Sequence, residues 1–151
     1  MSRAPNDCVL CAEDGGRLIW RDDVLRVIAV DEPRLPGYTR VVWQAHIAEM
    51  TDLTNADRAH VMRVVYAVEE IQRQVLGVDK VNLASLGNMT PHLHWHVMPR
   101  WRDDPWFPDS IWAPLQPVTT ERSETWTSRL PVLTALQADY EAALEQRLAQ
   151  R

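Results

Sequence analysis

The sequence lacks the segments that are typical of membrane-bound or secreted chains. Among its 151 residues, no apolar run approaches the ~20 that a membrane-spanning helix needs. The first residues, MSRAPNDC, contain no apolar signal-peptide core, so we expect a cytoplasmic protein that makes no membrane contact. Neither an internal repeat nor a low-complexity tract is evident. In the cytoplasm, two cysteines are better explained as thiols or metal ligands than as a disulfide.

Positive charge is also scarce. The sequence has 16 lysines and arginines against 21 aspartates and glutamates, which gives a net charge of −5. This balance argues against a nucleic-acid partner, because the phosphate backbone attracts basic surfaces. A small anionic substrate is compatible with it, since one local site can be positive on an acidic protein. Apolar residues at 46% and charged residues at 25% are typical of one globular domain with a buried core.

The most informative stretch runs from Asn82 to Trp101, NLASLGNMTPHLHWHVMPRW. Histidines stand at every second position, as His92, His94 and His96, with apolar residues between them, and this alternation predicts a β-strand. Residues two apart in a strand share a face and lie roughly 6.5 to 7 Å apart along the chain. The three imidazoles should therefore line one face, where each polar ring needs a partner. The alternative to a reaction site is a row of structural histidines whose ring nitrogens all have hydrogen-bond partners.

The segment PHLHWHVMPR resembles the signature of the histidine-triad (HIT) superfamily of nucleotide hydrolases and transferases, His-φ-His-φ-His-φ-φ, in which φ is apolar. Gly87 and Asn88 stand where the family has Gly-Gln before the triad, and the likeness extends from about Cys8 to Trp112. The resemblance implies an α+β, HIT-like fold with an antiparallel sheet of about five strands and a long helix packed on it. Because such proteins commonly pair, it also implies a homodimer.

Local patterns predict the individual elements. Strands are expected at residues 17–20, 24–30, 39–44, 81–86 and 92–99. A helix from the N-cap Thr54 to Leu76 has one apolar stripe, and a second helix is expected over 131–151, after a possible amphipathic stretch at 119–128. We expect a HIT domain over residues 1–113. A C-terminal extension with a helix, residues 114–151, should belong to the same compact unit.

The resemblance assigns the chemistry to the triad. His94 would attack the α-phosphate of an adenine, or more broadly purine, nucleotide conjugate such as a dinucleoside polyphosphate or a phosphoramidate. Neutral imidazole is a good nucleophile near pH 7, and water would then cleave the nucleotidyl-histidine. His96 would help to bind the phosphate, and His92 completes the catalytic set. The substrate-binding candidates are Asn88, whose amide would donate to the phosphate, Ser85 on the phosphate side, and Asp31, which would hold the ribose hydroxyls unless it only forms a turn.

A CxxC pair, Cys8 and Cys11, lies near the start of the chain. By itself it is half of a zinc site, a redox motif or a chance pairing, and a closed tetrahedral zinc site needs two more ligands. Some bacterial members of the resembled family complete such a pair with two histidines, and His46 and His92 stand at the matching positions. The resemblance therefore implies a structural zinc on Cys8, Cys11, His46 and His92, with no organic cofactor.

Two other parts of the sequence leave alternatives open. Many family members have a histidine where this chain has Tyr38, so the role of that side chain in phosphate binding is open here. Trp43-Gln44-Ala45 likewise replaces the common Ile-Pro-Lys. After Arg100 the chain becomes rich in tryptophan and proline. The tryptophans Trp101, Trp106 and Trp112 would stack on a base, seal a dimer contact or only cap the core.

Two further functions compete with nucleotidyl transfer to His94. In one, the HxHxH strand chelates a catalytic zinc, although this lacks a nearby fourth ligand and leaves both cysteines unused. In the other, the chain is a non-catalytic, zinc-stabilised module that only binds nucleotides. Chelator-sensitive turnover would indicate the first, chelator-resistant turnover would indicate His94, and no turnover would indicate the second.

Overall fold

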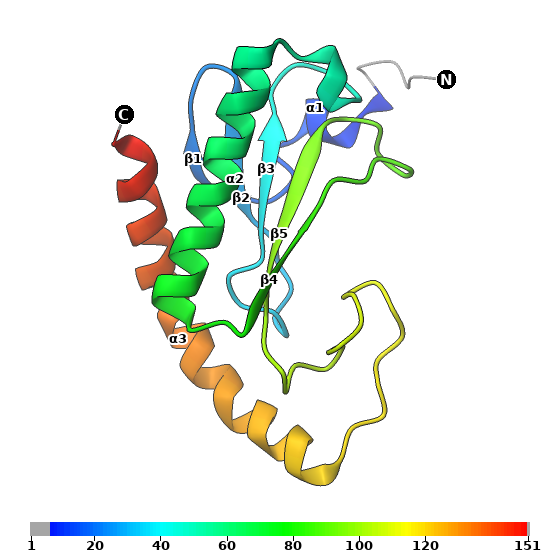
Figure 1. The fold of residues 1–151 in the computed structure, drawn as a ribbon, viewed down its shortest axis with the longest axis vertical. Coiled ribbons are helices and arrows are strands. Elements are labelled where there is room, and N and C mark those ends of the chain that lie inside the picture. Colours follow the sequence, from blue (N-terminus) through cyan, green and yellow to red (C-terminus); the bar gives the residue numbers. More distant parts are fainter. Residues whose placement is uncertain (1–6, 151) are drawn as a thin grey trace.

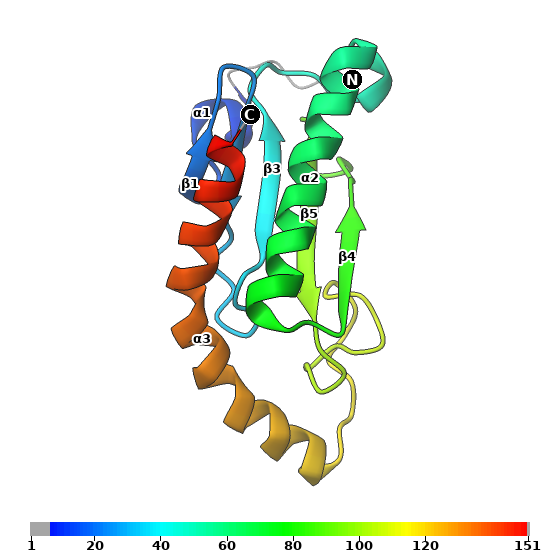
Figure 2. The same ribbon diagram turned by 60° about the vertical axis from the view of Figure 1, so that its left-hand side comes forward.

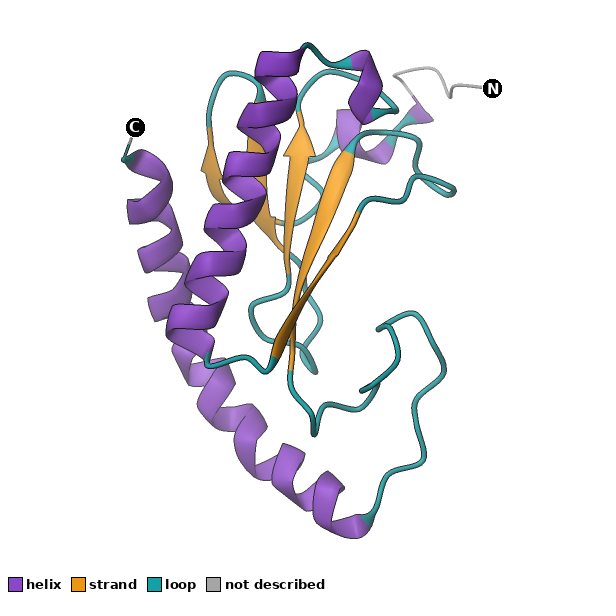
Figure 3. Ribbon diagram, viewed as in Figure 1, coloured by secondary structure: helices purple, strands orange, loops and turns teal. Residues whose placement is uncertain are grey.

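A five-stranded antiparallel sheet forms the centre of the molecule. The computed structural model describes residues 7–150, so residues 1–6 of the expected HIT domain and the expected helix end at 151 lie outside it. The strands are β1 (Arg17–Arg21), β2 (Leu25–Ala29), β3 (Thr39–Trp43), β4 (Lys80–Ala84) and β5 (His94–Arg100). They lie in the order β1-β2-β3-β5-β4, so β5 is an interior strand (Figures 1 and 3). The expected α+β architecture is confirmed.

The long helix α2 (Asn55–Leu76) covers one face of this sheet (Figures 1 and 2). Thr54 caps its start, because the threonine hydroxyl accepts the backbone N–H of Asp57 at 3.1 Å. Gly77 ends it at a φ of 59°, which glycine adopts without steric cost. The predicted helix is therefore confirmed. Leu93 and Val97 pack into the core beneath α2. Since strand side chains alternate, the triad histidines of β5 lie on the opposite face.

The C-terminal helix is longer than predicted. The 119–128 stretch and the expected 131–151 helix form one helix, α3 (Thr120–Ala149), with Pro131 inside it. A proline within a helix lacks one hydrogen bond and costs about 3 kcal/mol, and α3 changes direction in its orange part (Figure 1). Packing offsets this, since apolar residues on both sides of the proline are buried: Trp126, Leu133, Tyr140 and Leu144. No helix within residues 7–150 is long and apolar enough to cross a membrane.

A buried carboxylate organises the irregular segment between β5 and α3. Asp104, fully buried, accepts from the Arg100 guanidinium at 2.7 and 3.1 Å. It also accepts the backbone N–H groups of Trp106 and Phe107, both at 2.9 Å. Trp101 and Trp106 are thereby held in the core. For these two tryptophans the core-capping alternative is the correct one, whereas Trp112 is half exposed.

Candidate active site

The triad histidines lie where β5 is flanked by β3 and β4. The strand itself begins at His94, two residues later than predicted. Leu93, before the strand, donates its N–H to the Ile47 carbonyl in the loop after β3 at 2.6 Å, and its carbonyl accepts from the N–H of Trp43 at the end of β3 at 3.1 Å. In the ladder, His96 stands opposite Arg40 of β3 on one side and Ala84 of β4 on the other. All three triad rings are buried.

His94 is held in one tautomer by its own strand. Its Nδ1 lies 2.6 Å from the His92 carbonyl oxygen, which can only accept, so Nδ1 carries the proton. The Nε2 lone pair is therefore available for attack on an electrophile. Burial lowers the pKa of His94, which keeps the ring neutral at physiological pH. A neutral ring with a bare Nε2 is the form that a nucleophile requires.

His96 has the opposite tautomer. Its Nδ1 lies 2.6 Å from the Tyr38 hydroxyl and 3.3 Å from Nε of Arg40. Because a guanidinium can only donate, Nδ1 is the acceptor and the ring proton sits on Nε2. Burial and then the Arg40 charge lower the pKa of His96 to about 3. At neutral pH this ring is a hydrogen-bond donor and never a cation. No sequence pattern pointed to Arg40, because its contact with His96 depends on the register between β3 and β5.

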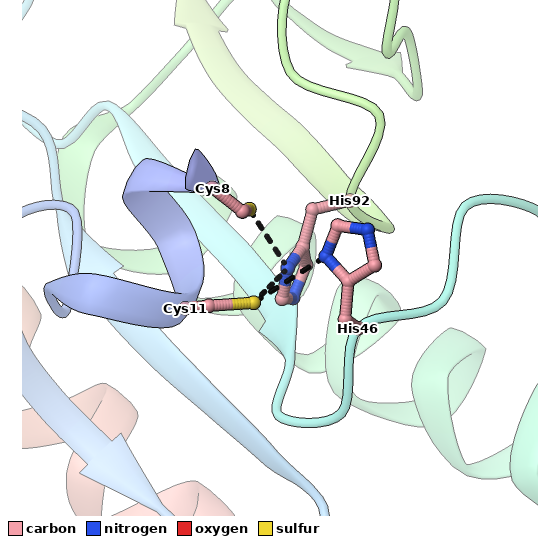
Figure 4. A group of neighbouring side chains, drawn as sticks. All are labelled: Cys8, Cys11, His46 and His92. Atoms are coloured by element: carbon pink, nitrogen blue, oxygen red, sulfur yellow. Dashed lines mark hydrogen bonds between the residues drawn. The ribbon is translucent and has the colours of Figure 1, made fainter. Parts of the chain in front are cut away.

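His92 lies beside the CxxC pair and His46 (Figure 4). Its Nδ1 lies 3.4 Å from the sulfur of Cys8 and 3.4 Å from that of Cys11, and His46 Nδ1 lies 3.3 Å from Cys11. The four ligand atoms all lie within 4.8 Å of one another. The edge between nitrogen and sulfur in a tetrahedral zinc site is about 3.5 Å, given the usual Zn–N and Zn–S bond lengths. The donor set and its spacing therefore fit a metal such as zinc.

The tautomer of His92 also suits a metal ligand. Its Nε2 donates to the Trp43 carbonyl at 2.6 Å, which leaves the Nδ1 lone pair directed at the sulfurs. Burial lowers the pKa of His92, and a neutral imidazole is the ligating form. The structure thus brings together all four residues that the sequence suggested for zinc.

A buried arginine, unforeseen from the sequence, supports the CxxC segment. Arg26 of β2 is 3% exposed and donates to the carbonyls of Leu10 at 2.7 Å, Glu13 at 3.2 Å and Asp14 at 3.0 Å. These carbonyls belong to and follow the short helix α1 (Val9–Ala12), which carries Cys11. One side chain therefore fixes the backbone of the cysteine segment against the sheet. An arginine in a short strand looks like a surface residue, so only the folded contacts reveal this role.

The three candidate substrate-binding residues are placed differently. The Ser85 hydroxyl donates to the His94 carbonyl at 3.0 Å, so this serine lies beside the triad strand. Asn88 is exposed in the turn that precedes the triad, and Asp31 is exposed just after β2. Among the described residues, no hydrogen bond joins Asn88 or Asp31 to a triad histidine. Both side chains are accessible to a ligand.

Trp112 reaches the triad from the segment after β5. Its ring meets the His96 ring edge-on, with centroids 5.0 Å apart, and half of its surface is exposed. Trp112 also lines a hollow of about 470 Å³, together with β4, Met98 of β5 and residues 110–111. A flat, partly exposed ring beside a hollow suits stacking on a base. The three tryptophans therefore do not share one role.

A larger groove lies elsewhere, between α2, the β1–β2 turn and the end of α3. Its volume is about 1790 Å³ and its lining includes His60, Arg63 and Glu70. His60 ties the turn to the helix, because its Nε2 lies 2.6 Å from the Asp22 carboxylate. His60 therefore has a packing role. The groove contains no triad histidine, so we assign the site by its side-chain chemistry rather than by the volume of the hollow.

Comparison with known proteins agrees with this geometry. The sequence model described as "HIT domain" matches residues 12–103. A fission yeast (Schizosaccharomyces pombe) asymmetrical bis(5'-nucleosyl)-tetraphosphatase is 24% identical over 95 residues, covering 60% of this chain and 52% of that protein. An AP-4-A phosphorylase from Mycobacterium tuberculosis is 26% identical over 99 residues, covering 62% and 51%. The chain thus spans about half the length of these curated relatives. A histidine triad protein from Marinobacter aquaeolei has a similar structure, with a TM-score of 0.62, 26% identity and coverage of 81% and 90%.

Proposed function

This chain belongs to the HIT domain family, and on that premise we propose that it is a nucleotide hydrolase or nucleotidyl transferase. It would cleave at the α-phosphate of an adenine, or other purine, nucleotide conjugate such as a dinucleoside polyphosphate or a phosphoramidate. The observation that carries the proposal is the 2.6 Å bond from His94 Nδ1 to the His92 carbonyl, which leaves Nε2 bare in a buried, neutral ring. Two distant relatives, one named as a bis(5'-nucleosyl)-tetraphosphatase and the other as an AP-4-A phosphorylase, support the substrate class.

The reaction proceeds in two displacements. His94 Nε2 attacks phosphorus and the leaving group departs, which gives a nucleotidyl-histidine, and water then attacks that phosphorus and frees His94. The His96 Nε2–H donates to the substrate phosphate, with the Asn88 amide as a further donor and Ser85 on the phosphate side of the triad strand. Asp31 accepts from the ribose hydroxyls. Arg40 places a positive charge beside the phosphate, although the chain as a whole carries −5.

We also propose a structural zinc on Cys8, Cys11, His46 and His92. The metal would hold α1 and the loop after β3 against the start of the triad strand, and it would supply no chemistry to the phosphate. His92 therefore acts on catalysis mainly through the backbone carbonyl that orients His94. The geometry does not favour a catalytic zinc on the HxHxH strand, because His92 Nδ1 faces the sulfurs and His94 Nδ1 is bonded to a carbonyl.

The remaining parts of the proposal concern assembly. We propose a cytoplasmic homodimer that acts on a small nucleotide, without nucleic acid, membrane or organic cofactor. The division into a HIT domain, residues 1–113, and an extension, 114–151, is part of the same proposal. Tyr140 in α3 bonds Thr39 in β3 at 2.7 Å, which supports one compact unit. Light scattering on the purified chain measures the oligomeric state directly.

The central test replaces the nucleophile. We expect His94→Ala to bind AMP with nearly unchanged affinity but to lose several orders of magnitude in turnover of diadenosine tetraphosphate and adenosine phosphoramidate. His60→Ala, which removes a histidine far from the triad, is the matched control and should keep its activity. Mass spectrometry after rapid, acid-free quenching should detect an adenylyl group on the peptide that contains His94. An active His94→Ala protein would refute the mechanism, and a wild type that binds AMP without turnover would indicate the binding module.

A further inference from the structure

The contacts of His96 raise the question of how a leaving group is protonated at this site. A departing amine or alkoxide must receive a proton as its bond to phosphorus breaks, or the step is very slow. A histidine usually gives such a proton as an imidazolium cation. His96 is 5% exposed and has a guanidinium against Nδ1, so this ring is neutral at physiological pH and holds one proton, on Nε2.

A neutral ring that gave up its Nε2 proton would become an imidazolate, which is far too basic to form. The transfer is possible only if Nδ1 gains a proton in the same step. Within residues 7–150, two groups are bonded to Nδ1, the Tyr38 hydroxyl at 2.6 Å and Nε of Arg40 at 3.3 Å. The guanidinium stays charged under all ordinary conditions and gives up no proton. The phenol of Tyr38 is therefore the one bonded group that can resupply the ring.

We propose that Tyr38 protonates the leaving group through His96, and that this relay suits the site to nucleotide conjugates with a strongly basic leaving group, an amine or an alkoxide. The proposal rests on the proposed function, because it requires that His94 attacks the α-phosphate. It separates the substrate classes that the sequence left open, since phosphoramidates and alkyl phosphodiesters need such a proton and polyphosphates do not.

The relay balances over the two displacements. In the first, the His94 Nε2 lone pair forms the bond to phosphorus, the bond from phosphorus to the leaving group breaks, and the leaving atom takes the His96 Nε2 proton. The Tyr38 proton moves to His96 Nδ1, so the site holds a cationic nucleotidyl-histidine and a tyrosinate. In the second, water attacks phosphorus and the His94 ring recovers its electron pair. A water proton goes to His96 Nε2, and the Nδ1 proton returns to Tyr38.

Arg40 stabilises the charged intermediate. Its guanidinium carbon lies 5.8 Å from the centre of the Tyr38 ring, and its Nε is bonded to the same Nδ1 that the phenol contacts. A tyrosinate formed at this place is therefore next to a permanent positive charge. Burial nevertheless raises the pKa of Tyr38 above the ordinary value of 10.0, with Arg40 acting against that shift. The phenol consequently gives its proton only to a leaving group more basic than itself, so the relay speeds the release of amines and alkoxides and adds nothing to the release of a weakly basic polyphosphate.

The experiment compares two conjugates that share the adenylyl group. One is adenosine 5′-phosphoramidate with an alkylamine as leaving group, and the other is the p-nitrophenyl ester of AMP, whose nitrophenolate leaves without a proton. Release of each leaving group is measured in the first turnover, which isolates the attack by His94 from the later water step. Tyr38→Phe should slow alkylamine release by about 10²-fold or more, the usual contribution of general acid catalysis, and slow nitrophenolate release by less than tenfold.

Two further variants keep the test decisive. Arg40→Gln retains the phenol and should show the same bias against the alkylamine, which protects the test if Tyr38→Phe fails to fold. Tyr140→Phe is the matched control, because it also removes a buried phenol hydroxyl, bonded to Thr39 at 2.7 Å and not to His96. It should lower the melting temperature without changing the ratio of the two release rates.

The outcomes separate the relay from the proposed function. Equal slowing of both substrates by Tyr38→Phe would overturn the relay and indicate that the phenol only orients His96, whereas no slowing of either would exclude Tyr38 from the reaction. In both cases the adenylyl adduct on His94 still forms. If the wild type forms no adduct with either conjugate, the proposed function itself fails. A selective loss with the alkylamine, together with an adduct on His94, supports both.

Discussion

Asp104 should be the residue whose charge contributes most to stability outside the sheet. Asp104→Asn keeps the size of the side chain but removes its charge and turns one acceptor oxygen into a donor. Arg100, 2% exposed, would then be a buried cation without its counter-ion, and the 2.7 Å bond to its Nε would be lost. Removing one partner of a buried ion pair typically costs about 3–5 kcal/mol, because the other charge stays uncompensated.

The expected loss in the free energy of unfolding can be measured by urea denaturation, and it should also appear as a lower melting temperature. For a chain of this size, a change of 1 kcal/mol shifts the melting temperature by about 2–4 °C, so Asp104→Asn should lower it by about 6–20 °C. Glu70→Gln is the control, since it breaks the exposed pair with Arg147 at 3.1 Å and should cost less than about 1 kcal/mol. Since Asp104 also orders the chain that leads to Trp112, the Michaelis constant should rise. A loss below about 1 kcal/mol for Asp104→Asn would refute the uncompensated-charge argument.

Three further predictions follow from the same contacts. Purified protein should contain about one equivalent of zinc, and Cys8→Ser and Cys11→Ser should lose metal and thermal stability but keep some activity; metal-free wild type, or activity restored only by added zinc, would contradict this. Trp106→Ala should lower stability by about 3–5 kcal/mol because it opens a core cavity, whereas Trp112→Ala should mainly raise the Michaelis constant, and the reverse pattern would contradict the assignment. The pKa of His96 falls from 6.5 to about 3 on folding, so between these pH values the unfolded chain binds a proton that the folded chain does not. The free energy of unfolding should therefore decrease as the pH falls below about 6.5. His96→Gln should make the free energy of unfolding depend less on pH in this range.

Local patterns predicted the elements whose residues make mostly local contacts. The helix starting at Thr54 was predictable because its cap, its stripe and its terminal glycine are all encoded within one stretch. Pro131 misled the prediction of the second helix. The missing N–H of a proline is a local signal for a helix start. Here the packing of residues on both sides of Pro131 keeps the chain helical across it, so α3 is continuous. Local rules fail there because the compensation comes from distant residues, such as Thr39 bonded to Tyr140.

The site was predictable only as a set of residue types. The histidine row and the CxxC pair were visible, and the resemblance joined them through His46 and His92. Arg40 and Arg26, which support the site, could not be predicted, because each reaches its partners only through the pairing of strands and loops in the folded chain. Arg40 meets His96 across the β3–β5 ladder, and Arg26 reaches carbonyls more than ten residues earlier in the chain. A charged residue within a short strand gives no local sign of such a partner.

The alternation of the triad also conceals how different its members are. A strand with period two makes His92, His94 and His96 look equivalent, yet each ring has its own partner and therefore its own tautomer. His92 gives Nε2–H to a carbonyl and turns Nδ1 toward sulfur, His94 gives Nδ1–H to a carbonyl and keeps Nε2 bare, and His96 accepts at Nδ1 and keeps the Nε2 proton. One ring is therefore suited to a metal, one to attack on phosphorus and one to donating a proton. Because these partners come from the end of β3, from the backbone two residues before β5 and from the residue just before β3, no single substitution within the HxHxH motif could exchange the three roles.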